Sequence, residues 1–192
     1  TLSLHDALPI WTTAELAARR NRTADSYRQA LQQIALESER MTTLVEDLLL
    51  LARTDLEAIE MPKRVFDLGL IVRDICSQMN PVAEEKSIQL TVQDTDGSHD
   101  LLGNEAAIRR LVLLLLDNAI KYSNAGGEVK VALENQGSKI LLQIIDSGPG
   151  INGDELPHIF ERFYRGQRLS SQKNEGNGLG LALAASIARD HA

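Results

Sequence analysis

One long segment of this chain carries its hydrophobic residues at heptad spacing. From Ala24 to about Asp55 the pattern predicts a single helix, in which apolar side chains recur every seven residues. The recurring positions are Ile34, Met41 and Leu48, with Leu44, Leu51, Val45 and Ala52 alongside. Such a seam is typical of a coiled coil or of a helical hairpin bundle.

A shorter helix is predicted before it, from Thr12 to about Arg20, followed by the polar stretch Asn21–Thr23. Two helices joined by a short loop form a helical hairpin. Each helix has one apolar stripe, and pairing of two copies into a four-helix bundle would bury both stripes. We therefore expect a homodimer formed through this hairpin. For the helical segment itself, the alternative to such a hairpin is an unrelated coiled coil.

Beyond residue 64 the pattern changes to alternating strands and helices. Residues 57–64 contain Pro62 and mixed polarity and are interpreted as a linker. Asn135–Ser138 is a hairpin signal between two alternating runs. The predicted strands are 65–67, 88–92, 101–102, 128–134 and 139–145, and the predicted helices are 68–83 and 105–120. The fold class is therefore α+β, a helical hairpin followed by an α/β sandwich.

Composition excludes several classes of function. The net charge of −7 and an aromatic content of 4% argue against nucleic acid as a partner. The longest apolar run, Leu111–Leu116, is far shorter than the roughly 20 residues that span a bilayer, so we expect this chain to be soluble. Cys76 is the single cysteine and lies in a helical apolar pattern, which favours a small buried role. His5, His99, His158 and His191 are scattered and do not form a metal site.

Two glycine clusters carry the candidate chemistry. They are Asp146–Ile151 and Gly176–Leu181, and the aromatic and basic segment Phe160–Arg165 lies between them. Upstream, Asn118 lies on a strongly apolar helix and is followed by Lys121. Glycines allow backbone N–H groups to approach a ligand closely. A glycine-rich turn before a helix also favours phosphate oxygens.

The order and spacing of these segments resemble the N box, first G box, F box and second G box of the GHKL nucleotide-binding fold, in its sensor histidine kinase branch. The resemblance covers nearly all of the chain after about residue 11. Glu39–Arg53 is also similar to the second helix of the dimerisation and phosphotransfer hairpin of these kinases. The resemblance implies a hairpin over 1–56, a linker over 57–64 and an ATP-binding domain over 65–192 that lacks its C-terminal strand pair, so that the sheet is left partly unpaired.

The resemblance further implies ATP and Mg²⁺ as cofactors, a response-regulator receiver domain as partner, and a cytoplasmic position in a parent protein anchored upstream in a bacterial membrane. The implied reaction is transfer of the γ-phosphoryl group to a histidine and then to an aspartate. The implied nucleotide-binding residues are Asn118, Lys121, Tyr122, Asp146, Gly148, Gly150, Ile151, Phe160, Arg165, Gly176, Gly178, Leu179, Gly180 and Leu181. Arg162 and Lys121 are the implied catalytic groups, and Asn118 the implied metal ligand.

Each role has a chemical reason and an alternative. The adenine amino group requires a buried carboxylate, for which Asp146 is the candidate, although this residue could instead only open the turn. Magnesium prefers oxygen ligands, which Asn118 supplies. Lys121 can reach a phosphate or remain a solvated helix end, and Arg162 and Arg165 can neutralise the γ-phosphate or remain exposed arginines.

One position separates two classes of enzyme. GHKL ATPases have a glutamate four residues before the asparagine, where this chain has Leu114. An aliphatic side chain cannot act as a general base, so phosphoryl transfer is favoured and an ATPase is the weaker alternative. Asn104 is predicted to cap the following helix, and the polar loop from about Gly166 to Glu175 is predicted to be an ATP lid.

The first ten residues do not fit the family pattern. A His-Glu-x-x-x-Pro box aligned on Thr12–Leu16 places the phosphoacceptor at Thr1, while His5 lies off this register. Leu2–Ile10 looks like translated sequencing-adapter sequence, and Pro9 is expected to break a helix there. We therefore expect no autophosphorylation on histidine by this chain, which leaves a non-catalytic ATP-binding dimer module as the alternative function.

Overall fold

The computed structural model describes residues 4–19, 23–55, 62–94, 98–137, 139–166 and 178–191. The chain divides into two compact units, residues 1–52 and 53–192. The predicted domain boundaries near residues 56 and 64 stay predictions, since residues 56–61 lie outside the described part of the chain.

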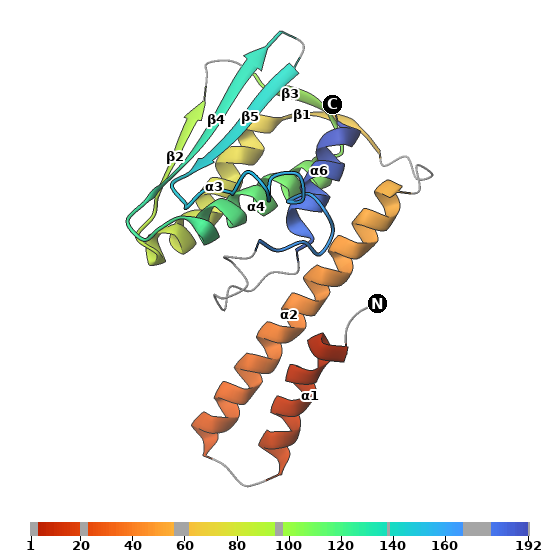
Figure 1. Ribbon diagram of the computed structural model, residues 1–192, viewed down its shortest axis with the longest axis vertical. Helices are drawn as coiled ribbons and strands as arrows, with labels where there is room; N and C mark the ends of the chain where they lie inside the picture. Colours follow the sequence, from red (N-terminus) through yellow and green to blue (C-terminus); the bar gives the residue numbers. More distant parts are fainter. Residues whose placement is uncertain are drawn as a thin grey trace. The chain divides into compact units, whose positions relative to one another are not determined.

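The first unit is a helical hairpin formed by α1 (Leu4–Ala18) and α2 (Ala24–Asp55), as Figure 1 shows. Ahead of α2, the Thr23 hydroxyl accepts a hydrogen bond from the backbone N–H of Ser26 at 3.2 Å. This is the bond that an N-cap residue makes. The seam residues Ile34, Met41 and Leu48 are half-buried in this unit.

The start of α1 corrects the sequence prediction. The helix begins at Leu4, not at Thr12, and continues through Pro9. Proline removes one backbone donor, here the bond to the carbonyl four residues earlier. Pro9 is only the sixth residue of α1, and the first four N–H groups of any helix have no intrahelical acceptor. Pro9 lies just beyond these four, so α1 accommodates it at the cost of one regular hydrogen bond near its start.

The second unit contains a three-stranded sheet in the order β2-β4-β5. β2 (Gln89–Asp94) runs parallel to β4 (Glu128–Gln136), which pairs antiparallel with β5 (Lys139–Asp146). The last two strands join through Gly137, with φ +65°, and this confirms the predicted hairpin. A separate two-stranded sheet pairs β1 (Arg64–Asp67) antiparallel with β3 (Asp100–Gly103).

Helices form the other layer of this unit. α3 (Leu68–Glu85) and α4 (Glu105–Tyr122) pack on the large sheet, and α6 (Gly180–Asp190) packs on α4 (Figure 1). The core between the layers holds fully buried side chains from β4 and all three helices. They include Val72, Val112, Leu116, Val129, Val131, Leu133, Leu183 and Ile187. The predicted α+β architecture is confirmed.

Local signals in the sequence explain where two of the helices begin. The Asp67 carboxylate accepts the N–H of Gly69 at 2.8 Å at the start of α3. Asn104 Oδ1 accepts the N–H of Ala107 at 2.8 Å at the start of α4, which confirms the predicted cap. Cys76 is buried on α3, as expected, and burial raises the pKa of its thiol to about 11.

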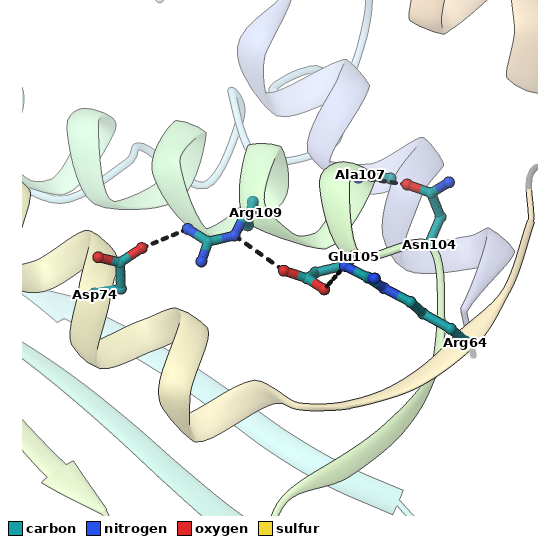
Figure 2. A network of polar contacts seen from close by, with 6 residues as sticks. All are labelled: Arg64, Asp74, Asn104, Glu105, Ala107 and Arg109. Carbon is teal, nitrogen blue, oxygen red and sulfur yellow. Dashed lines mark hydrogen bonds and ion pairs between the residues drawn. The ribbon is translucent and has the colours of Figure 1, made fainter.

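A polar network connects β1, α3 and the start of α4 (Figure 2). Arg64 pairs with Glu105, which also accepts from Arg109 Nε at 3.3 Å. Arg109 Nη1 lies 2.5 Å from Asp74 Oδ2 on α3. The hydrogen bond from Arg64 holds the pKa of Glu105 below its ordinary value, and the hydrogen bond from Arg109 does the same for Asp74. These pairs are largely exposed, so we expect them to add little to stability.

In the part of the chain that the structure describes, every helix is too short or too polar to cross a bilayer.

Candidate functional site

The carboxyl end of α4 presents the amide and lysine that the sequence singled out. Asn118, Lys121 and Tyr122 are all half-buried there. Lys121 Nζ lies 5.4 Å from the centre of the Tyr122 ring, within the range of a cation–π contact. Burial raises the pKa of Tyr122, the positive charge of Arg165 lowers it and Asp117 raises it further. Arg165 therefore lies close enough to this helix end to act on it electrostatically.

The first glycine cluster packs directly against the same helix end. A Cβ atom on Gly148 would lie 2.7 Å from the carbonyl oxygen of Tyr122, so only glycine fits this approach. Gly150 has φ +71°, a conformation that favours glycine. The turn after β5 is thus shaped by its two glycines to follow the end of α4.

Asp146 differs in one respect from the expectation. Its side chain was expected to be buried, but it is exposed in the structure, because the residue ends a strand at the carboxyl edge of the sheet. One carboxylate oxygen accepts the N–H of Gly148 at 2.8 Å. Asp146 therefore opens the turn after β5, as the alternative interpretation expected. Its contact with adenine stays a prediction.

The second glycine cluster leads into α6. The carbonyl of Gly178 accepts the N–H of Phe163 at 2.9 Å, and Gly178 has φ +66°. A Cβ atom there would lie 2.7 Å from the carbonyl carbon of Phe163. Gly180 starts α6, and a Cβ atom on it would lie 3.6 Å from Leu114 Cδ2 of α4. The amino end of α6 is thus held against the carboxyl half of α4.

The first turn of α6 has the properties of an anion site. Leu179 occupies its N-cap position without a side-chain hydrogen bond, and Leu179 itself is buried. Uncapped N–H groups and the helix dipole both favour negative charge. Glycines at 178 and 180 add no side chain of their own beside these N–H groups.

The structure does not bring every predicted residue into this cluster. Ile151, Phe160 and Arg162 are exposed, and Leu181 is half-buried on α6. Gly176 and, apart from Gly166, the predicted lid from about Gly166 to Glu175 lie outside the described residues, as does Thr1, the residue aligned with the phosphoacceptor. Phe163 has the left-handed φ of +64°, which is strained for a non-glycine residue.

Sequence reasoning missed one supporting contact. The Ser147 hydroxyl accepts the N–H of Glu128 at 2.8 Å, and Asn124 Nδ2 donates to the Ser147 carbonyl at 3.1 Å. A Cβ atom on Gly127 would lie 2.1 Å from Ser147 Oγ. The glycine pair directly before a strand, at positions 126–127, was the available signal for this close approach.

Next to the first glycine cluster lies an open hollow of about 560 Å³ lined by Asn152, Gly153, Asp154, Glu155, His158 and Tyr164. His158 is exposed, and its Nδ1 lies 2.7 Å from Glu161 Oε1. The carboxylates of this hollow repel phosphates, so the hollow does not suit the polyphosphate chain of a nucleotide.

Comparison with known proteins identifies the family. Residues 103–192 match the family described as histidine kinase-, DNA gyrase B- and HSP90-like ATPase. The solved mycobacterial sensor histidine kinase MprB is 30% identical, with a TM-score of 0.59 over 68% of this chain and 80% of that chain. The chain belongs to the sensor histidine kinases. The GHKL resemblance of the glycine clusters is thereby confirmed at the level of the family.

Curated relatives agree with this assignment. Sensor histidine kinase RppB of Synechocystis is 37% identical over 161 residues, and sensor protein kinase PmrB of Pseudomonas aeruginosa is 33% identical over 180 residues. These alignments cover 84% and 94% of this chain but 36% and 37% of the relatives. This sensor histidine kinase chain thus spans little more than a third of the length of those relatives. Acinetobacter baumannii AdeS, 23% identical with a TM-score of 0.69, shares the fold.

Proposed function

We propose that this chain binds ATP between the carboxyl end of α4 and the amino end of α6, and that its parent kinase transfers the γ-phosphoryl group to a histidine. The observation that carries the proposal is the packing of both glycine clusters on one half of α4, Gly148 against Tyr122 and Gly180 against Leu114. Asn118, Lys121 and the uncapped start of α6 all belong to the elements that this packing joins.

Each part of ATP meets a suitable group in this arrangement. The Asp146 carboxylate accepts a hydrogen bond from the adenine amino group, and the negative charge of the carboxylate strengthens that bond. Lys121, Arg165 and the first turn of α6 attract phosphate oxygens. Arg162, although exposed here, is the further candidate for the γ-phosphate.

The residues present also fit a magnesium ion. Mg²⁺ takes one or two protein oxygens and completes its coordination with phosphate oxygens and water. Asn118 supplies a side-chain carbonyl at a half-buried helix end. When bound, the ion would neutralise charge on the phosphates and orient them for transfer.

Transfer is favoured over hydrolysis at this site. Leu114 lies on α4 one turn before Asn118, and it is half-buried against the start of α6. Its aliphatic side chain cannot remove a proton from water. The site therefore suits presentation of ATP to a histidine of the kinase, followed by relay to an aspartate of a response regulator.

Two partners belong to this proposal. A solved structure with a TM-score of 0.71 and 18% identity is histidine kinase ThkA in complex with response regulator protein TrrA, and the shared fold supports a similar partner here. A second copy is the other partner, because the hairpin exposes apolar side chains such as Leu31 and Val45.

Calorimetric titration with ATP and Mg²⁺ tests the nucleotide site. Asp146→Asn removes a charge-assisted hydrogen bond of roughly 1.5–3 kcal/mol, so we expect affinity to fall about tenfold or more. Asp154→Asn is the matched control, since it removes an exposed carboxylate on the rim of the acidic hollow. Equal affinity of Asp146→Asn and wild type would remove this residue from the site.

Incubation with γ-labelled ATP tests the transfer step. The chain with Thr1 at the aligned acceptor position should gain no acid-labile label, and a His-Glu-x-x-x-Pro box restored over residues 1–6 should gain it. Acid-labile label on the unmodified chain that disappears in His5→Gln would instead make His5 the acceptor. Binding of ATP without label in the restored chain would favour the non-catalytic ATP-binding module.

A further inference from the structure

His191, at the carboxyl end of α6, connects this helix to the start of α4. Its Nε2 accepts the backbone N–H of Asn104 at 3.0 Å, and its Nδ1 lies 2.8 Å from the carbonyl oxygen of Ile187. A carbonyl only accepts and an N–H only donates, so the proton must be on Nδ1 and Nε2 must be bare. The two contacts together define the tautomer of this ring.

The neighbouring glycine makes room for this ring. A Cβ atom on Gly103 would lie 2.4 Å from Cδ2 and 2.9 Å from Nε2 of His191. No side chain larger than hydrogen fits there unless the imidazole moves. Gly103 is buried and immediately precedes the cap residue Asn104. A glycine and a histidine 88 positions apart in the chain thus form one fitted contact, the His191 bridge.

The bridge lies at the opposite end of the helix pair from the proposed nucleotide site. It joins the amino end of α4 to the carboxyl end of α6, whereas Gly180 at the amino end of α6 lies against Leu114 of α4. The two helices therefore pack antiparallel along much of their length. Asn104 and Asn118 are 14 residues apart on α4, or about 21 Å at 1.5 Å per residue.

We propose that His191 is a positioning residue that fixes α6 on α4 through this bridge and so holds the glycine cluster at the start of α6 opposite Asn118. This role rests on the proposed function, because the glycine cluster binds phosphate only if that proposal is correct. Without the imidazole the N–H of Asn104 loses its acceptor and the end of α6 loses its anchor. The nucleotide site forms only while α6 is packed on α4. The apparent affinity for ATP is therefore proportional to the fraction of molecules in which α6 is packed.

Three variants separate positioning from general stability. His191→Phe keeps an aromatic ring but removes both nitrogens. His191→Gln keeps one acceptor and one donor and should restore the bridge. Gly103→Ala leaves His191 intact but occupies the space of its ring. If His191→Phe does not fold, His191→Gln and Gly103→Ala still test the proposal.

Amide hydrogen exchange of the nucleotide-free chain gives the first readout. The N–H of Leu183 donates to the Leu179 carbonyl at 2.9 Å and reports the first turn of α6. We expect His191→Phe and Gly103→Ala to speed its exchange about tenfold, with α3 amides unchanged and His191→Gln close to wild type. Equal acceleration of α3 and α6 amides would overturn the proposal, because it would mean a loss of global stability only.

Two further measurements complete the test. Nitrogen NMR of the wild-type ring should show the proton on Nδ1, and a proton on Nε2 would contradict the bridge. ATP affinity should fall about threefold or more in His191→Phe and Gly103→Ala and recover in His191→Gln, and equal affinities in folded variants would overturn the positioning role. Failure of the wild type to bind ATP would count against the proposed function, and exchange at Leu183 would then decide the bridge alone.

Discussion

The helices α2 and α4 carry similar amounts of leucine but bury it very differently. Val112 and Leu116 of α4 are completely buried, whereas Leu31 and Leu49 of α2 remain 65% and 53% exposed. α4 lies in a layer with α3 and α6 over a sheet, so it has neighbours on several sides. Among the described residues of its own unit, α1 is the one other element beside α2 (Figure 1). An apolar pattern therefore predicts that a helix face is buried, but it does not determine whether the same chain or a second copy buries it.

This contrast separates two sources of stability. The core of the second unit is formed within one chain, and its side chains are already removed from water. Apolar surface that α2 leaves exposed can gain roughly 25 cal/mol per Å² only when another surface covers it. We therefore expect mutations to act on folding in the second unit and on association in the first.

The largest expected effect is on the free energy of unfolding and comes from the buried core of the second unit. Leu183 on α6 is completely buried, so Leu183→Ala should lower the free energy of unfolding by about 2–5 kcal/mol through lost contacts and a cavity. The matched change Leu49→Ala on α2 should stay within about 0.5 kcal/mol, because this leucine is exposed. Urea unfolding of both variants measures the difference, and losses of similar size would break the contrast.

A smaller effect is expected at the surface of the hairpin. Leu31 and Val45 lie two heptads apart on one stripe beside the predicted seam, and both are exposed. The double variant Leu31→Glu with Val45→Glu should weaken dimerisation about tenfold or more, since it places charge where apolar surface would be buried. Sedimentation equilibrium measures this change.

The matched control for the hairpin adds the same charge elsewhere on α2. Leu36→Glu with Leu49→Glu alters two exposed leucines away from that stripe. It should leave the dimer close to wild type. If both double variants weaken association equally, charge rather than position is responsible, and the predicted dimer face is wrong.

The smallest effect concerns acid stability of the second unit. The pKa values of Glu105 and Asp74 are lowered in the folded state by their arginine partners. A lowered folded pKa stabilises the protein above the ordinary value of the carboxyl group. The ordinary pKa is 4.5 for Glu105 and 3.8 for Asp74. The stabilisation from each carboxylate is lost as the pH falls from this ordinary pKa through the lower pKa of the folded state.

Glu105→Gln should therefore reduce the pH dependence of the thermal midpoint between about pH 5 and pH 3. The change should be small, because exposed ion pairs contribute little. Glu85→Gln, at an exposed position on the last turn of α3, controls for loss of a carboxylate. Identical acid profiles in wild type and Glu105→Gln would assign no stabilising role to the network.

Several elements were predictable because their cause is local. Asn104 caps α4 since an amide oxygen next to a helix start accepts an unpaired N–H, and this needs no distant partner. Gly137 with φ +65° closes the β4–β5 hairpin for a similar local reason. Two positions near the ends of elements were predicted wrongly: Pro9, close to the start of α1, did not end that helix, and Asp146, at the end of β5, proved exposed.

The sequence by itself determined the family, the two kinds of helix pattern and the glycine clusters, because motif spacing and periodicity depend on chain order alone. Only the tertiary structure decided that Gly148 lies against Tyr122, that Gly180 lies against Leu114, and that His191 joins Asn104. These contacts link residues 26, 66 and 87 positions apart. No local pattern encodes such separations, since they follow from how rigid helices pack on a shared core.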